Sequence, residues 1–371
     1  MTKAAELAKM GEVLTNSQIG GRRNIIINGQ FSCFQRGVSF TGVANTAYHA
    51  DRFQLYMQNE ASQYTVTQDS DTPNGFGNCL KLDVTTADTS TASNEEVKLL
   101  YKIEGQDLQQ FKKGTSDTEK MTLSFYVKTN KTGIYCVELF DRDNSREVSA
   151  SYTVADANWN RYTITFPADT SGAFDDDNAS SLEIMFWLVA GSAVQGGTLN
   201  TAWRSAADGS SATGQVNFSD STDNNWQLTG VQLEVGSQAT PFEHRSFGEE
   251  LALCQRYYTR EGAGTGGVYK RVASGICNTT TAADYLINLS TPLRAAPTLE
   301  TSGNVNHYLM YSANGTDVVT ALALNNDSDD GTFNHSVSFY GIVGSGLGAG
   351  DSVLLITNAN ATYYLALDAE L

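Results

Sequence analysis

Short segments that alternate apolar and polar residues fill the chain from about residue 23 to 235, and no helical stretch separates them. Clear examples span residues 121–128, 134–140, 161–166 and 182–189. Successive side chains of a strand point to opposite faces, so each segment has an apolar face that must be covered. Because about ten such strands are separated by turn clusters, we predict an all-β fold with a jelly-roll-like two-sheet sandwich over residues 23–245.

A second series of alternating segments follows residue 262. Its members are residues 268–276, 283–288, 307–311, 318–324, 336–342, 353–357 and 363–367. At roughly 110 residues, this part is long enough to have its own core. We predict a second, smaller β-sandwich over residues 262–371, which begins at the glycine-rich hinge 262–267.

The last strand of the first domain changes its apolar phase at one point. Trp226 and Leu228 belong to the same phase as Gly230, whereas Val231 and Leu233 belong to the opposite phase. A slip of one residue without a turn is typical of a β-bulge, where glycine is favoured. We therefore predict a bulge at Gly230.

A short helix is predicted between the two domains, over residues 246–261. Ser246 stands three residues before Glu249, which is the spacing of a capping box. One helix face is then formed by Phe247, Leu251, Cys254 and Tyr258. The sandwich therefore ends in a capped corner that starts the second domain.

The first 22 residues contain another short amphipathic pattern, with Leu7, Met10 and Leu14 on one face. A helix of this length is not stable alone in water. It either docks on its own domain or pairs with copies of itself as a brief coiled coil. Both interpretations stay open; in the second, residues 1–22 are an anchor and oligomerisation segment.

Charge and composition exclude several classes of function. The net charge of −17 repels phosphate backbones, so we expect no nucleic-acid partner. The N-terminus lacks the apolar region of a signal peptide, and no apolar run approaches about 18 residues, so we expect no membrane insertion. The five cysteines are far apart and odd in number, which indicates free, packed thiols made in a reducing compartment.

Motifs for chemistry are mostly missing. Gly262, Gly264 and Gly267 match a dinucleotide-binding spacing, but a strand-like segment follows where that motif requires a helix. Asp141-x-Asp143-x-Ser145 begins like a calcium loop but lacks its later glycine and glutamate, so we interpret it as an Asx turn. We expect no catalytic residues, no cofactor and no metal.

Sugar binding requires an aromatic face with acids or amides beside it. Trp187 and Trp226 lie inside predicted strands, and Trp159 lies just before one, so these are better explained as core. Trp203 lies in a long loop rich in small residues, with Asp208 nearby. Trp203 and Asp208 are therefore our candidates for glycan binding.

Three stretches resemble a family of bacteriophage virion proteins. They are IIINGQFSCFQRG at 25–37, YHADRF at 48–53 and GVQLEVGSQATPFEHRSFGEELALCQRYY at 230–258. The family comprises tail fibres and receptor-binding appendages with a jelly roll similar to carbohydrate-binding modules. The resemblance implies a structural, often trimeric protein that is made in the host cytoplasm and carried on the virion. It also implies architectural roles for Asn28, Gly29, Gly230, Pro241, Glu243, Arg256 and Tyr257.

Three hypotheses follow. The first is a non-enzymatic homotrimeric tail fibre, attached to other virion proteins by its N-terminal segment, that contacts host-surface glycans or proteins. The second is a head fibre, neck appendage or adaptor with a purely structural role. The third is a capsular polysaccharide depolymerase, although the sequence selects no carboxylate pair from 41 acidic residues.

Overall fold

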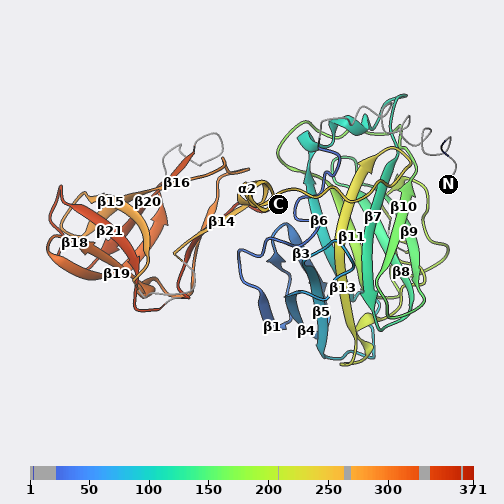
Figure 1. Ribbon diagram of the computed structural model, residues 1–371, viewed down its shortest axis with the longest axis horizontal. Helices are drawn as coiled ribbons and strands as arrows, with labels where there is room; N and C mark the ends of the chain where they lie inside the picture. Colours follow the sequence, from blue (N-terminus) through green and yellow to red (C-terminus); the bar gives the residue numbers. More distant parts are fainter. Residues whose placement is uncertain (1–2, 4–21, 208, 263–268, 326–334, 361) are drawn as a thin grey trace. The chain divides into compact units, whose positions relative to one another are not determined.

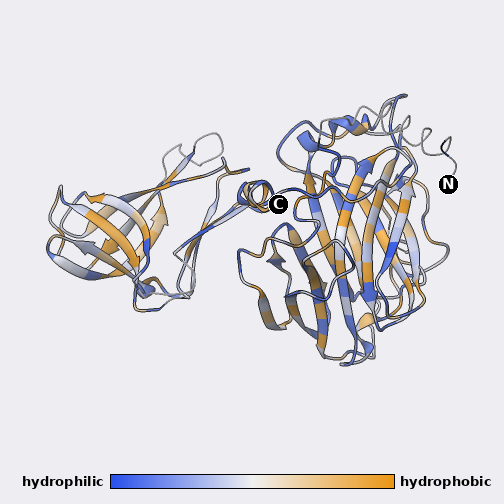
Figure 2. Ribbon diagram, in the orientation of Figure 1, coloured by the Kyte–Doolittle hydropathy of each residue, from blue (hydrophilic) through white to orange (hydrophobic). Residues whose placement is uncertain are grey.

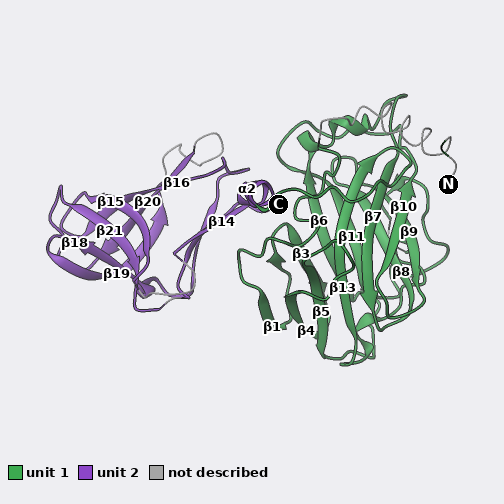
Figure 3. Cartoon of the chain, viewed as in Figure 1, with its two compact units in different colours: residues 1–247, 371 green, residues 248–370 purple. Residues whose placement is uncertain are grey.

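The computed structural model describes residues 3, 22–207, 209–262, 269–325, 335–360 and 362–371 (Figure 1). The chain divides into unit 1, residues 1–247 with 371, and unit 2, residues 248–370 (Figure 3). Leu7, Met10 and Leu14 of the predicted N-terminal helix lie outside the described residues, as do positions 263–267 of the predicted hinge.

Unit 1 consists of two antiparallel sheets. The six-stranded sheet has the order β1 (Ser39–Val43), β4 (Gln63–Asp69), β5 (Cys79–Thr86), β13 (Asn225–Val235), β7 (Met121–Thr129), β10 (Asn160–Phe166). The seven-stranded sheet has the order β12 (Arg204–Ser205), β9 (Arg146–Val154), β8 (Gly133–Asp141), β11 (Ser180–Ala190), β6 (Glu96–Glu104), β3 (Phe53–Gln58), β2 (Ala47–Ala50). Short 3-10 helices occur at η1 (Gly105–Asp107), η2 (Gln109–Phe111) and η3 (Phe218–Asp220).

One hydrophobic cluster draws side chains from both sheets. On β7 the alternate residues Leu123, Phe125 and Val127 are fully buried in it. On β11 the cluster takes Ile184 and Phe186, and the Phe186 ring meets that of Phe125 edge-on at 5.1 Å between centroids. The alternation is visible along the strands of Figure 2. The predicted all-β class is confirmed, and the jelly-roll-like connectivity stays a prediction.

The predicted bulge is present in β13. Its pairing with β7 shifts between Thr229 and Gln232, and Gly230 has a φ of 64°. Gly29 lies against the bulge, where a Cβ would stand 2.1 Å from the carbonyl oxygen of Val231. The Val231 N–H donates to the carbonyl of Gly29 at 2.9 Å. The absence of a side chain at Gly29 therefore allows the two backbone segments to approach closely.

The other residues given architectural roles make local contacts. Asn28 has a φ of 62°, and its side chain accepts the N–H of Cys33 at 2.9 Å. Glu243 accepts the backbone N–H groups of Arg23 and Asn24 at 3.2 and 2.8 Å.

Three further members of this set lie at the corner and in unit 2. The carbonyl of Pro241 accepts a hydrogen bond from Arg23 at 3.3 Å. In unit 2, the Arg256 carbonyl accepts the N–H of Arg294, and the buried Tyr257 accepts that of Ala369.

All but the first residue of a helix belongs to unit 2, and strands follow it. Helix α2 (Phe247–Gln255) starts directly after Ser246, but the predicted helical segment 246–261 ends in a strand, β14 (Tyr258–Glu261). A three-stranded sheet has the order β14, β22 (Leu365–Asp368), β17 (Thr298–Thr301).

The remaining strands of unit 2 form a closed barrel rather than the predicted second sandwich. The order is β15 (Arg271–Cys277), β16 (Ala282–Asn288), β20 (Ser336–Val343), β19 (Gly315–Leu324), β18 (Tyr308–Ser312), β21 (Ser352–Thr357), with η4 (Val305–His307) before β18. β21 pairs back onto β15, which closes the barrel. Alternation gives one buried face in either architecture, so only this long-range pairing distinguishes them.

All five cysteines lie among the described residues, and each is buried as a free thiol, as predicted. Burial raises the pKa of Cys79 and of Cys136 to about 12. Among the described residues, no helix is both long and apolar enough to cross a membrane.

Candidate functional site

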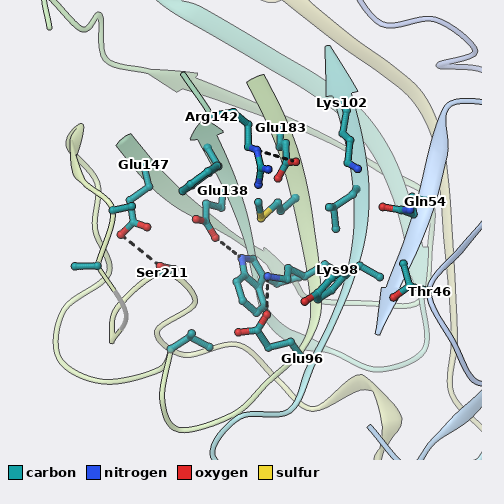
Figure 4. A pocket seen from close by; sticks show the side chains of 18 residues that line it. Thr46, Gln54, Glu96, Lys98, Lys102, Glu138, Arg142, Glu147, Glu183 and Ser211 are labelled. Carbon is teal, nitrogen blue, oxygen red and sulfur yellow. Dashed lines mark hydrogen bonds and ion pairs between the residues drawn. The ribbon is translucent and has the colours of Figure 1, made fainter. Parts of the chain in front are cut away.

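A pocket of about 580 Å³ lies on the outer face of the seven-stranded sheet (Figure 4). It is lined by Thr46, Gln54, Tyr56, Glu96, Lys98, Leu100, Lys102, Glu138, Phe140, Arg142, Glu147, Glu183, Met185, Trp187, Val194, Ala206, Ala207 and Ser211. On β6, Val97, Leu99 and Tyr101 enter the core, so the period of two turns Lys98 and Lys102 toward the pocket.

Strand register arranges the lining in rows across the sheet. One row contains Glu147, Phe140, Glu183 and Lys102, from β9, β8, β11 and β6. The next contains Glu138, Met185, Leu100 and Gln54. A third contains Trp187, Lys98 and Tyr56. Neighbours in a row are about 4.5–5.5 Å apart, so charged, amide and apolar side chains lie side by side at close range.

Trp187 is the fixed centre of this surface. Its Nε1–H donates to Oε2 of Glu138 at 3.1 Å. The Lys98 ammonium lies 4.1 Å from the Trp187 ring centroid and 5.1 Å from that of Tyr56. Lys98 also pairs with Glu96 at 2.7 Å. The Trp187 indole N–H and the Lys98 ammonium are therefore held in place without a ligand.

Glu138 is a buried acid in the pocket. Desolvation raises the pKa of its carboxyl from 4.5 to about 8, although the positive charge of Lys98 acts in the opposite direction. Trp187 uses one carboxyl oxygen as its acceptor. At neutral pH the other oxygen can carry the proton and donate a hydrogen bond.

Two arginines lie beside the other two carboxylates of the pocket, Glu147 and Glu183. Arg204 donates from Nε and Nη2 to Oε1 of Glu147 at 2.9 and 2.6 Å. Arg142 lies 3.8 Å from Glu183, and 55% of its side chain is exposed, so its guanidinium is available at the surface. Figure 4 shows the Arg142–Glu183 pair beside Glu138.

The segment between β11 and η3 forms one wall of the pocket. The small residues of this segment predict an exposed loop with a strand at 215–218. The loop prediction is wrong in part, and the strand prediction is wrong, because residues 215–217 form no strand and Phe218 begins η3. Val194 and Ala212 are buried in a cluster with Cys136 and Trp187 on the outer face of the sheet. In the described part of the segment, the strand is the short β12, which pairs with β9. Small side chains such as Ala212 allow the segment to pack closely on the sheet.

The candidates chosen from the sequence lie elsewhere. Trp203 is half-buried, its Nε1–H donates to the Pro167 carbonyl at 2.8 Å, and it is not among the residues that line the pocket. Asp208 lies outside the described residues. A glycan-binding role for either stays a prediction. One sequence signal could have located the pocket. Glu96, Lys98 and Lys102 fall on the same side of one strand, and charged side chains there indicate the face of the sheet that points away from the core.

No family model matches this sequence, and no curated protein matches it. Solved structures with some similarity include an enzymatically active tailspike domain of bacteriophage CBA120, at 15% identity and a TM-score of 0.27, covering 57% of this chain and 21% of that one. A putative sugar-binding protein of Bacteroides thetaiotaomicron has 13% identity and a TM-score of 0.33, covering 57% and 100%. A family 11 carbohydrate-binding module of Clostridium thermocellum has 15% identity and a TM-score of 0.27, covering 56% and 94%. Likenesses this low carry no argument about function.

Proposed function

We propose that this chain is a non-catalytic structural protein of a bacteriophage virion, a tail fibre that binds a host-surface glycan in the pocket of unit 1. The sequence resemblance at residues 25–37 and 230–258 supports the virion assignment. One observation carries the binding assignment: the outer sheet face combines aromatic, charged and amide side chains in a single preorganised hollow.

The chemistry of the pocket suits a sugar. Sugar rings present apolar C–H faces, which pack on aromatic rings such as the half-buried Tyr56 and Phe140. Their hydroxyls need donors and acceptors, which Gln54, Glu183 and Arg142 supply. The volume also falls in the usual range for ligand sites.

The carboxylates favour binding over hydrolysis. Glu138 and Glu183 occupy diagonal positions on paired strands, roughly 7–8 Å apart along the backbone, which is compatible with an inverting pair. Glu138, however, is 4% exposed and bonded to Trp187, and Glu147 is bound by Arg204. Their oxygens serve to hold the pocket together, so we propose no catalytic step.

The wider role follows from the resemblance. We propose a homotrimer that is made in the host cytoplasm, assembled into the virion through its N-terminal segment and exposed to the host surface. Three weak sites on one particle raise avidity well above the affinity of a single site. Light scattering should then report a mass about three times that of the 40.0 kDa chain.

Binding should depend on the half-buried and exposed side chains of the pocket. We expect Tyr56→Ala and Arg142→Ala each to weaken binding about tenfold or more, through loss of a ring contact and of a charged donor. The measurement is binding to a glycan array and to purified capsular polysaccharide and lipopolysaccharide. A ligand identified there is then titrated by calorimetry.

Matched controls are Tyr311→Ala and Arg271→Ala, which remove an exposed tyrosine and arginine from unit 2. Equal losses in the control variants would place binding elsewhere. Firm binding to another virion component with no glycan binding would favour the adaptor or head-fibre role. Release of reducing ends, abolished by Glu183→Gln, would identify a depolymerase.

A further inference from the structure

A buried ammonium group sits in a cage of oxygens at one end of unit 1. Lys113 Nζ lies 2.5 Å from Oδ2 of Asp141 and 3.1 Å from Oδ2 of Asp169. It also donates to the carbonyl oxygens of Ser171 and Gly172 at 2.8 and 2.9 Å. An ammonium has three N–H donors, so these four oxygens exceed what it can satisfy by single hydrogen bonds.

The cage is assembled from three segments of the chain. Lys113 follows η2, where Lys112 adopts a left-handed φ of 50°. Asp141 is the last residue of β8, and Asp169 lies between β10 and β11. The side chains of Lys113, Asp141 and Asp169 are 1, 0 and 5% exposed, so the charges are removed from water and depend on one another.

The surrounding bonds fix the oxygens in place. Arg146 donates to both carboxylate oxygens of Asp169, at 2.7 and 3.0 Å. Asp141 Oδ1 accepts the backbone N–H of Asn144 at 3.0 Å, and the Asn144 amide donates to the Ala173 carbonyl at 2.8 Å. The oxygens are therefore held by groups other than the ammonium that they surround.

We propose that the Lys113 ammonium occupies a cation site, so that removal of this side chain converts the cage into a binding site for a small hard cation such as Ca²⁺. Calcium prefers carboxylate and carbonyl oxygens, and the cage supplies two of each with room for water where the lysine stem was. Of the calcium-like Asp141-x-Asp143-x-Ser145 pattern, only Asp141 contributes to the cage, where it holds an amino group; Asp143 instead accepts the backbone N–H of Asp175 at 2.9 Å.

The cage also supports the pocket. Asp141 lies between Phe140 and Arg142 in the sequence, and Arg146 precedes Glu147; all three of these neighbours line the pocket. The Lys113 ammonium therefore provides the positive charge at the turn between β8 and β9, next to these pocket residues. Wild-type unit 1 should need no metal to keep this turn in place.

The test compares the wild-type full chain with Lys113→Ala in chelator and in CaCl₂. We expect Lys113→Ala in chelator to lose about 10 °C in Tm, since one partner of a buried ion pair has been removed. CaCl₂ should restore most of this loss, and calorimetry should detect one Ca²⁺ per chain. The wild type should show neither effect.

Two further variants make the result decisive. Asp141→Asn added to Lys113→Ala should abolish rescue by Ca²⁺, because it removes a charged ligand. Lys113→Met, which keeps the stem in the cage, should be destabilised without rescue. The proposal is overturned if Lys113→Ala binds no Ca²⁺, or if neither it nor Lys113→Ser folds in CaCl₂.

Discussion

Replacing Gly29 with alanine is expected to lower the free energy of unfolding of unit 1 by about 3 kcal/mol or more. The added Cβ would stand 2.1 Å from the Val231 oxygen, a backbone atom in a central strand. That oxygen also accepts a hydrogen bond from the Asn24 side chain at 3.1 Å. Relief of the clash must therefore break either this bond or the bond between Val231 and Gly29.

Tryptophan fluorescence during urea unfolding measures this effect selectively. The four tryptophans, Trp159, Trp187, Trp203 and Trp226, all belong to unit 1. Gly77→Ala is the control, because a Cβ at Gly77 meets nothing within 4 Å. If both variants unfold at the same urea concentration, the close approach of Gly29 and Val231 does not stabilise the fold.

Replacing Glu138 with glutamine should remove a large dependence of stability on pH. The folded-state pKa of about 8 exceeds the reference value of 4.5, so the folded protein retains a proton that the unfolded chain releases. The stabilising contribution of Glu138 is complete below about pH 4.5 and is lost as pH rises through 8. A shift of this size corresponds to at most about 4–5 kcal/mol.

Glutamine keeps an acceptor for Trp187 and does not titrate. We therefore expect Glu138→Gln to gain stability relative to the wild type between about pH 5 and 9. Urea unfolding across this range measures the difference, and the native fluorescence of the wild type should titrate near pH 8 while that of the variant does not. Parallel stability curves for the two proteins would contradict a protonated Glu138.

The sequence predicts what is local in this protein. The alternation of apolar and polar residues predicts the ends of β7, β8 and β10 to within one residue. It does so because a strand with one buried face has an apolar residue at every second position. The phase slip identified the bulge at Gly230, and Ser246 marked the start of α2. Each of these features depends on a few consecutive residues.

The pocket and the barrel depend on pairing between distant segments. Lys98, Glu138 and Trp187 meet only because β6, β11 and β8 are neighbours in one sheet, and alternation does not specify which strands pair. The apolar run around Trp187 predicts a place in the core; Trp187 is buried, but in a cluster with Val194 and Ala212 on the outer face of the sheet. The sequence therefore predicts that a strand residue is buried, but it does not predict which face of the sheet the residue lies on.

Closure of the barrel in unit 2 affects how such a protein behaves at high local concentration. Because β21 pairs with β15, each strand of the barrel that the structure describes has a hydrogen-bonded neighbour on both sides, and none offers a free strand edge. An open sheet would offer such an edge as a template for strands of neighbouring copies. Neighbouring copies are therefore not expected to add strands to the barrel itself, whereas β14 and β17 are edge strands of the three-stranded sheet in unit 2.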